Sequence, residues 1–292
     1  MKVKKEYVKS PLNYVGGKYK LLQQMLPKFP NEINTFVDLF GGGFNVGVNV
    51  PAKRIVYNDK SKQVTELLQY QYDTEIQQQL QEIDAIIAEY QLSKENADGY
   101  NQLRDDYNKA PTPIKFYVLI CYAFNNQYRF NNKGQFNMPF GKNRSSFNET
   151  LRKRYIAFVE EMKKHTCIYG AQDFREMQVP NDKTFIYCDP PYLATQAVYN
   201  SCEGGWTEKD EKDLLQLLKN LSTYQIPWAL SNNIMTNPAL EQWAIEHNYN
   251  INRLEVSYSN CNYHKKDKQT PDAEVLICNY KAVADGRIEI IT

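Results

Sequence analysis

The sequence predicts an α/β fold in which one sheet domain carries a mostly helical insert. Short runs rich in β-branched and aromatic residues, which are typical of strands, occur toward both ends of the 292-residue chain. Between them, residues 61–164 are charged and have mainly helical periodicity. We therefore expect residues 1–60 and 165–292 to form the sheet domain and residues 61–164 to form the insert.

Strand signals define the expected sheet. Two apolar runs, at 35–40 and 53–57, precede the insert. The first is followed by glycine and the second by asparagine and aspartate. The remaining strands are expected after the insert, at 166–169, 184–188, 227–231, 251–258 and 274–280.

Two helices are expected in the sheet domain. A turn at Gly16 and Gly17 leads into a helix over 18–26, which should stop before Pro27 because proline interrupts a helix. The second helix spans 206–220, with Thr207 as its N-cap and acidic residues in its first turn, where they favour the helix dipole.

The insert is predicted to be helical except for one polar stretch. Apolar residues recur at helical spacing across 61–107, and further helices are expected at 114–124 and 151–163. Residues 125–150 are rich in Asn and Gly and predict a hairpin or an ordered loop.

Charge is distributed unevenly along the insert, although the net charge of the chain is only +1. Residues 58–108 contain 11 Asp/Glu and 4 Lys/Arg, whereas residues 109–165 contain 11 Lys/Arg and 3 Asp/Glu. A localised basic block interleaved with Tyr, Phe and Asn is typical of a nucleic-acid-binding surface. The alternative is a solvated basic helix face.

Composition argues against several other classes. The apolar runs are too short to span a bilayer, and the first seven residues lack the apolar core of a signal peptide, so we expect a cytoplasmic protein without a membrane partner. No Cys-x-x-Cys pair occurs, which argues against a zinc site and a disulfide scaffold, and we expect no metal. The six cysteines and three histidines are scattered: Cys121, Cys167, Cys188, Cys202, Cys261, Cys278, His165, His247 and His264.

The most informative motif is Asp189-Pro190-Pro191-Tyr192, directly after the apolar run 184–188. Two prolines make a stiff extended corner at the end of a buried strand. The Asp189 carboxylate and the Pro190 carbonyl are acceptors there, and Tyr192 adds a flat face, so the corner suits a planar group that carries an NH2. A simple strand-ending turn is the alternative.

A glycine loop follows the first predicted strand. Phe36-Val37-Asp38-Leu39-Phe40 leads into Gly41-Gly42-Gly43, where glycines let a ligand approach the backbone closely. Asp59, at the end of the second strand, has the position of an acidic residue that holds ribose hydroxyls. The loop lacks the G-x-G-x-x-G pattern and a Lys-Ser/Thr pair, which disfavours dinucleotide hydride chemistry and a P-loop. The alternative is a plain tight turn.

Four stretches together resemble the DNA adenine-N6 methyltransferases of the Dam type (α group, D12 class), which use S-adenosylmethionine. The resemblance covers about residues 11–282, and the order of glycine loop, recognition segment and Asp-Pro-Pro-Tyr matches the α group. The stretches are 14–18, 36–43 with Asp59, 124–141 without 132 and 133, and 189–192.

The resemblance implies a Rossmann-like methyltransferase sheet domain and a target-recognition insert that contains a hairpin. It implies transfer of a methyl group from S-adenosyl-L-methionine to N6 of an adenine flipped out of double-stranded DNA. Asp189, Pro190 and Tyr192 would hold the flipped adenine. The cofactor would contact Tyr14, Lys18, Phe40, Gly41, Gly43, Asp59, Asp173 and Phe174.

The resemblance also implies DNA contacts. Arg129 is the candidate base reader, because arginine can bond guanine O6 and N7 together; a phosphate clamp is its alternative. Phe124 is a candidate to enter the duplex, with a core position as its alternative. The other expected DNA-binding residues are Asn125, Gln127, Asn137, Lys142, Arg144 and Asn260. A cognate restriction nuclease that acts separately would be compatible with this family.

Two departures from the family pattern fall in DNA-facing segments. Asn13-Tyr14-Val15 replaces a common Lys-Trp, and Asn126-Gln127 replaces a common Gly-Leu. The GATC target frequent in the family is therefore not carried over. Two other functions stay open: the same chemistry on RNA or a protein amide, and a DNA-binding protein with an inactive site. The intact Asp189 and Lys18 argue against the second.

Overall fold

The computed structural model describes residues 6–14, 16–179, 183–193, 205–255, 274–282 and 287–291. Its strands are β1 (Thr35–Asp38), β2 (Arg54–Asn58), β3 (Thr166–Gly170), β4 (Thr184–Cys188), β5 (Trp228–Asn233), β6 (Asn250–Arg253), β7 (Glu274–Cys278), β8 (Tyr280–Ala282) and β9 (Ile288–Ile290). The longer helices are α2 (Lys62–Asp73), α3 (Ile76–Glu89), α4 (Ala97–Lys109), α5 (Pro113–Tyr122), α6 (Glu149–Met162), α8 (Glu208–Thr223) and α9 (Pro238–Glu246). Short helical turns are η1 (Lys18–Leu21), α1 (Leu22–Met25), η2 (Leu26–Lys28), η3 (Gly47–Asn49), η4 (Phe124–Asn126) and η5 (Phe174–Glu176).

Seven strands form one mostly parallel sheet in the order β3-β2-β1-β4-β5-β7-β6. The first five in this order are mutually parallel, whereas β7 pairs antiparallel with both β5 and β6. β8 and β9 form a separate two-stranded ribbon. The predicted α/β fold is therefore confirmed, and the mostly parallel sheet is consistent with the Rossmann-like arrangement that the resemblance implies.

Alternate residues of the central strands enter two different cores, as the period of a strand requires. Val37 and Ile186 face a core shared with α8 and α9. Phe36 and Phe185 face a second core, which they share with α1, α2, α5 and α6. Because both faces are covered, β1 and β4 are buried at every residue rather than at alternate ones.

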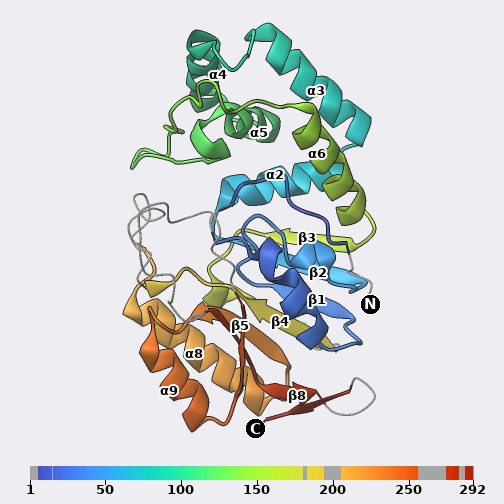
Figure 1. Ribbon diagram of the computed structural model, residues 1–292, viewed down its shortest axis with the longest axis vertical. Coiled ribbons are helices and arrows are strands. Elements are labelled where there is room, and N and C mark those ends of the chain that lie inside the picture. Colours follow the sequence, from blue (N-terminus) through green and yellow to red (C-terminus); the bar gives the residue numbers. More distant parts are fainter. Residues whose placement is uncertain are drawn as a thin grey trace.

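The chain from α2 to α6 extends away from the sheet (Figure 1). α2 lies against both β3 and α5, while α3 and α4 pack on α5. Helix starts here are well defined, because Asn96, Thr112 and Asn148 each accept a backbone N–H of the first turn. α5, at the centre of this block, has eight buried residues among ten, so it serves as its core helix.

Residues 124–141 form a hairpin-like loop against the helical block. Isolated bridges join Ala123 to Phe140 and Phe130 to Phe136. The tip turns at Asn131, whose side-chain oxygen accepts the backbone N–H groups of Lys133 and Gln135 at 2.9 and 3.0 Å. The prediction of a hairpin or ordered loop over 125–150 is therefore confirmed for this part.

Several predicted elements need correction. The helix expected over 18–26 is divided into η1, α1 and η2, and Pro27 lies inside η2. Proline is tolerated there because the first turn of a helix needs no N–H donor at that position. Sequence analysis also missed α9, which begins at Pro238 after Asn237, and the ribbon β8–β9. The strand expected over 251–258 corresponds to β6, and residues 256–258 lie outside the described ranges.

Candidate active site at the carboxyl ends of β1 and β4

The chain reverses its direction of winding between β1 and β4. From β1 it proceeds outward to β2 and β3, then returns to place β4 on the other side of β1. Such a switch point leaves a crevice outside the carboxyl ends of the two strands, where α/β proteins bind ligands. The glycine loop follows β1 and the Asp-Pro-Pro-Tyr corner follows β4, so both predicted motifs meet at this position.

The corner after β4 is held by an ion pair. Lys18 Nζ lies 2.7 Å from Asp189 Oδ1, and the side chains are only 4% and 18% exposed. Lys18 also donates to the Gly16 carbonyl at 2.9 Å, and its Nζ lies 5.1 Å from the centroid of the Tyr192 ring. Burial raises the pKa of Asp189 and the Lys18 charge opposes that shift. The structure thus brings Lys18, Asp189 and Tyr192 together, while Pro190 is buried beside them.

Glu274, the first residue of β7, is a member of this corner that sequence analysis missed. The Tyr192 hydroxyl donates to Glu274 Oε2 at 3.0 Å. Burial raises the pKa of Glu274, and the Lys18 charge opposes this shift as well. An acidic residue before an apolar strand is too common a pattern to have identified it.

Asp59 closes the glycine loop. Its Oδ2 accepts the Gly42 N–H at 2.9 Å and its Oδ1 accepts the Ser61 N–H at 2.8 Å. Gly41 is required by packing, because a Cβ there would lie 2.2 Å from Cε2 of the Tyr57 ring. Asp59 therefore fixes the shape of the loop, and each carboxylate oxygen keeps a lone pair for a further donor.

Tyr14 lies over the same loop. A Cβ at Gly42, whose φ is +48°, would lie 2.9 Å from Tyr14 Cε1, and one at Gly43 would lie 2.9 Å from Tyr14 Cβ. Tyr14 also contacts Tyr128 of the hairpin-like loop over residues 124–141, with ring centroids 6.2 Å apart. The predicted cofactor residues Tyr14 and Gly43 are thus in direct contact.

Asp38, at the carboxyl end of β1, is a second residue that sequence analysis did not single out. Its side chain is 1% exposed, Oδ2 accepts the Gly47 N–H at 3.0 Å, and Oδ1 has no hydrogen-bond partner among the described residues. Burial raises its pKa to about 8. A buried carboxylate oxygen without a donor is costly, and a cationic ligand group would compensate it.

Phe40 and Phe174, both predicted cofactor residues, meet in an aromatic cluster with Trp206. The three ring centroids lie 5.5 to 5.6 Å apart. Phe174 is buried, whereas Phe40 is half-buried and retains an accessible surface beside the glycine loop. Trp206 anchors the cluster, because its Nε1 donates to the buried Glu211 at 2.6 Å.

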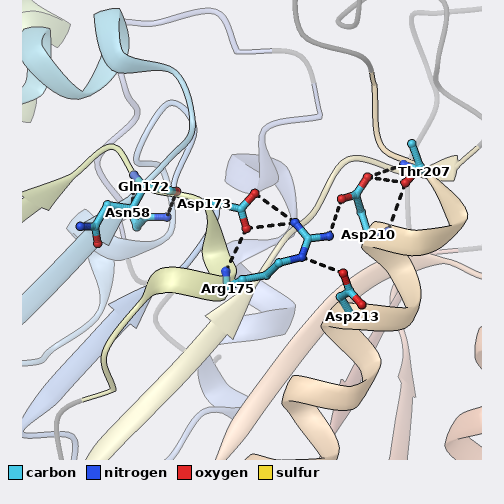
Figure 2. Close-up of polar contacts among 7 residues, drawn as sticks. All are labelled: Asn58, Gln172, Asp173, Arg175, Thr207, Asp210 and Asp213. Carbon is cyan, nitrogen blue, oxygen red and sulfur yellow. Dashed lines mark hydrogen bonds and ion pairs between the residues drawn. The ribbon is translucent and has the colours of Figure 1, made fainter.

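Arg175 ties this cluster to α8 (Figure 2). Its guanidinium donates to Asp173 at 3.0 Å, to Asp210 at 2.5 Å and to Asp213 at 2.7 Å. It also lies 4.5 Å over the Phe174 ring. Both carboxylate oxygens of Asp173, a predicted cofactor residue, therefore accept hydrogen bonds from Arg175. Asp210 also forms a capping box with Thr207, the residue predicted as the N-cap of α8.

Arg129 lies in the hairpin-like loop and is held by Asn137. Arg129 Nε donates to the Asn137 side-chain oxygen at 2.9 Å, and Nη2 donates to the Asn137 carbonyl at 3.1 Å. The Asn137 N–H in turn donates to the Arg129 carbonyl at 2.9 Å. The Nε edge of the guanidinium is thus engaged, while the side chain remains exposed.

The other predicted DNA-binding residues surround this loop. Phe124 is 43% exposed, so it is no core residue, and Lys142 and Arg144 are exposed. Asn125 adopts φ +56° and its carbonyl accepts Asn13 Nδ2 at 2.7 Å. Gln127 is half-buried beside it. Asn260 lies outside the described residues.

The φ of Asn126 explains one departure from the family pattern. Asn126 adopts φ +53° at the position where many members have glycine, and asparagine tolerates this conformation better than most residues. Its side chain donates to the Cys121 carbonyl at 2.8 Å, which links the loop to the end of α5. The substitution therefore preserves the local backbone.

Within the described ranges, no helix combines the length and apolarity needed to cross a membrane. The same residues contain no group of three or more His, Cys, Asp or Glu side chains arranged to hold a metal ion.

Comparisons with known proteins agree with this geometry. Residues 14–270 match the D12 class N6 adenine-specific DNA methyltransferase family. The chain is 42% identical over 286 residues to "Modification methylase StsI" of Streptococcus sanguinis, covering 95% of this chain and 44% of that protein. It is 41% identical over 283 residues to "Type II methyltransferase M.FokI" of Planomicrobium okeanokoites, covering 94% and 43%.

A more distant relative is covered more completely. "DNA adenine methylase" of Escherichia coli (strain K12) is 25% identical over 230 residues, which is 76% of this chain and 80% of that protein. The chain spans less than half the length of the two relatives with the higher identity. On the family match and the coverage of its own length, the chain belongs to the D12 class N6 adenine-specific DNA methyltransferase family.

Proposed function

We propose that this chain transfers a methyl group from S-adenosyl-L-methionine to N6 of an adenine flipped out of duplex DNA. The observation that carries the proposal is the buried corner at the carboxyl end of β4, where Asp189 and Tyr192 lie together at the switch point of the sheet. Family membership supports it, since members generally depend on S-adenosylmethionine and two relatives are named as modification methylase and adenine methylase.

In this proposal the sheet domain, residues 1–60 and 165–292, binds the cofactor and performs the transfer. The insert, residues 61–164, recognises the DNA target. Two observations support this division. The loop over residues 124–141 and the residues just after it carry exposed basic side chains, and this loop is far in sequence from the Asp189 corner. α2 and α6 also share the core of the sheet face, so the two parts would move together.

The residues around the glycine loop fit S-adenosylmethionine. Asp38 Oδ1 is a buried acceptor without a described partner, and it would accept the ammonium group of the methionine moiety. Asp59 would accept the ribose hydroxyls with its remaining lone pairs. The nonpolar and backbone walls would come from Tyr14, Phe40, Gly41, Gly43 and Phe174, with Asp173 near the adenine ring.

When bound, S-adenosylmethionine would supply an electrophilic methyl group attached to a sulfonium. The N6 lone pair of adenine is delocalised into the ring and is a poor nucleophile. Hydrogen bonds from its two N–H groups to Asp189 and the Pro190 carbonyl would localise that lone pair and orient it for direct in-line transfer. The Asp189 charge would stabilise the positive charge that develops on N6 as S-adenosylhomocysteine leaves, and N6 would then lose one proton to solvent water. Tyr192 would stack on the ring.

Lys18 would prepare this corner for the amine. It occupies Oδ1 of Asp189, and its charge opposes the rise in the Asp189 pKa that burial causes. Oδ2 would remain to accept an N6–H, so the carboxylate would be oriented before the base arrives.

Recognition of DNA would begin at the exposed loop. Arg129 would read a guanine with its guanidinium. Phe124 would enter the duplex and offset part of the free-energy cost of flipping the adenine out of the stack, which is about 3 kcal/mol. Asn125, Gln127, Asn137, Lys142, Arg144 and Asn260 would contact the duplex. A nuclease of the same target would act as a separate protein; the name "modification methylase" of a relative supports this part.

A transfer assay tests the proposal. Purified protein is incubated with S-adenosylmethionine labelled in its methyl group and, separately, with duplex DNA of random sequence, structured RNA and protein. We expect label in duplex DNA, recovered as N6-methyladenine, and none with Asp189→Ala. Label in RNA or protein alone would favour the alternative substrates, and binding of DNA without any transfer would favour an inactive DNA-binding protein.

A further inference from the structure

We propose that Glu274 is a positioning residue of the catalytic corner, which holds Tyr192 in the orientation that stacks on the target adenine. This inference rests on the function proposed above and deepens it. It assigns a role to a carboxylate that lies in the site but contacts neither Asp189 nor the glycine loop through any described hydrogen bond.

The sheet topology explains why Glu274 reaches the corner. Ligand-binding residues of this fold come from the carboxyl ends of parallel strands. β7 runs antiparallel to β5, so its amino end, rather than its carboxyl end, lies at that edge of the sheet, with Glu274 paired to Asn233. The first residue of β7 is therefore at the same edge as Asp189, the residue that follows β4.

Two contacts restrain Tyr192 in complementary ways. The hydroxyl lies on the rotation axis of the ring, so its 3.0 Å hydrogen bond to Glu274 Oε2 fixes where the ring lies without fixing its plane. Lys18 Nζ, 5.1 Å from the ring centroid, favours one orientation of the ring face. With one face toward Lys18, the opposite face would stack on the base.

Glu274 also affects the charge of the corner. Asp189 and Glu274 both interact with the single ammonium group of Lys18, whose charge lowers the pKa of each carboxyl against burial. Loss of the Glu274 charge would leave Lys18 and Asp189 as a balanced pair. The hydrogen bond and the charge can therefore be separated with Glu274→Gln, which keeps an acceptor oxygen and removes the charge.

The experiment measures single-turnover methyl transfer to duplex DNA, together with the Kd for DNA and for S-adenosylmethionine. For Glu274→Ala we expect the transfer rate to fall about tenfold, the effect of losing one hydrogen bond that acts in the transition state, with both Kd values unchanged. Glu274→Gln should restore the rate to within about threefold of wild type, because its amide oxygen accepts the same hydrogen bond.

A double-mutant comparison identifies the partner. Tyr192→Phe keeps the ring and removes the hydroxyl, which interacts with both Glu274 and Asp189, so it should lower the rate at least as much as Glu274→Ala. The double variant should be no slower than Tyr192→Phe alone. Glu241→Ala is the matched control, because it breaks an ion pair with Arg253 at the surface of the same domain and should leave the rate unchanged. Tyr192→Phe also serves if Glu274→Ala does not fold.

Different outcomes would overturn the proposed function and the positioning role of Glu274. Wild-type protein that binds S-adenosylmethionine but transfers nothing to duplex adenine would overturn the proposed function and this inference with it. An active wild type with an unaltered rate in Glu274→Ala, or with a double variant whose loss is the product of the single losses, would overturn the inference alone.

Discussion

The corner after β4 and the hairpin-like loop over residues 124–141 are held in different ways. Lys18 lies in η1, before β1, whereas Asp189 and Tyr192 follow β4, so these two distant segments meet only when the sheet domain folds. Arg129, in contrast, is held by Asn137, eight residues away in the same loop. If the function is as proposed, the chemistry would depend on the global fold, whereas target reading would depend on a contact within one loop.

The largest effect should come from removing the charge that the corner presents to the amine. Asp189→Ala should lower kcat by about 10³-fold, the typical loss when one preorganised electrostatic contact is removed, with little change in S-adenosylmethionine binding. Single-turnover kinetics and calorimetry check the two parts. An unchanged kcat would mean that the corner is a strand-ending turn without a catalytic role.

Asp38 offers a test through stability. Because burial raises its pKa from 3.8 to about 8, the folded state favours the protonated form. Its contribution to stability is therefore fully present below pH 3.8 and is lost as pH rises toward 8. Asp38→Asn, which cannot ionise, should raise the free energy of unfolding relative to wild type by about 5 kcal/mol at pH 8 and by about 2 kcal/mol at pH 5.

The same variant should bind S-adenosylmethionine more weakly, because the amide lacks the charge that would compensate an ammonium group. Denaturant unfolding at the two pH values and a binding isotherm make the comparison. Equal stabilities at both pH values would contradict the raised pKa, and unchanged binding would remove Asp38 from the proposed cofactor site.

An Arg129 variant tests whether target recognition can be changed without changing the rate of methyl transfer. Arg129→Ala should reduce discrimination at one guanine by about 1–3 kcal/mol while the transfer rate on the best target stays close to wild type. Asn137→Ala should relax the same position to a smaller extent, since it frees the guanidinium without removing it. Rates on oligonucleotides with single base changes provide the measurement. An equal loss on all sequences would assign Arg129 to phosphate.

The smallest effect is expected at the exposed basic side chains. Lys142→Ala should weaken binding uniformly across sequences and reduce the slope of log K against log salt by about 1, as expected for one lost phosphate contact. Titrations over a range of salt concentrations measure it. A loss restricted to one target sequence would show that Lys142 reads a base instead.

Much of the fold was predictable because its signals are local. The apolar run at 184–188 is followed directly by Asp-Pro-Pro. Because proline stops a strand at a defined residue, β4 was predicted with its observed bounds. Thr207 was predicted as an N-cap from a local signal too, because its hydroxyl can accept a backbone N–H of the first helical turn. α9 was missed although Pro238 stands at its first position, because its apolar residues form no clear stripe.

The site was predictable only in part. Motif residues such as Asp189 and Asp59 follow strands directly, and the positions of these strands in a parallel sheet bring their ends together. Glu274 and Asp38 could not be identified, because their roles depend on strand direction and burial rather than on a motif. The partnership of Arg129 with Asn137 likewise required the loop register, which the sequence between them does not specify.

The most direct test maps N6-methyladenine in DNA from cells that express wild type, Asp189→Ala or Arg129→Ala. We predict N6-methyladenine confined to one short motif for wild type, none above background for Asp189→Ala, and a broader set of motifs for Arg129→Ala. Absence of N6-methyladenine with wild-type protein that folds and binds S-adenosylmethionine would contradict the account, as would equal methylation by Asp189→Ala.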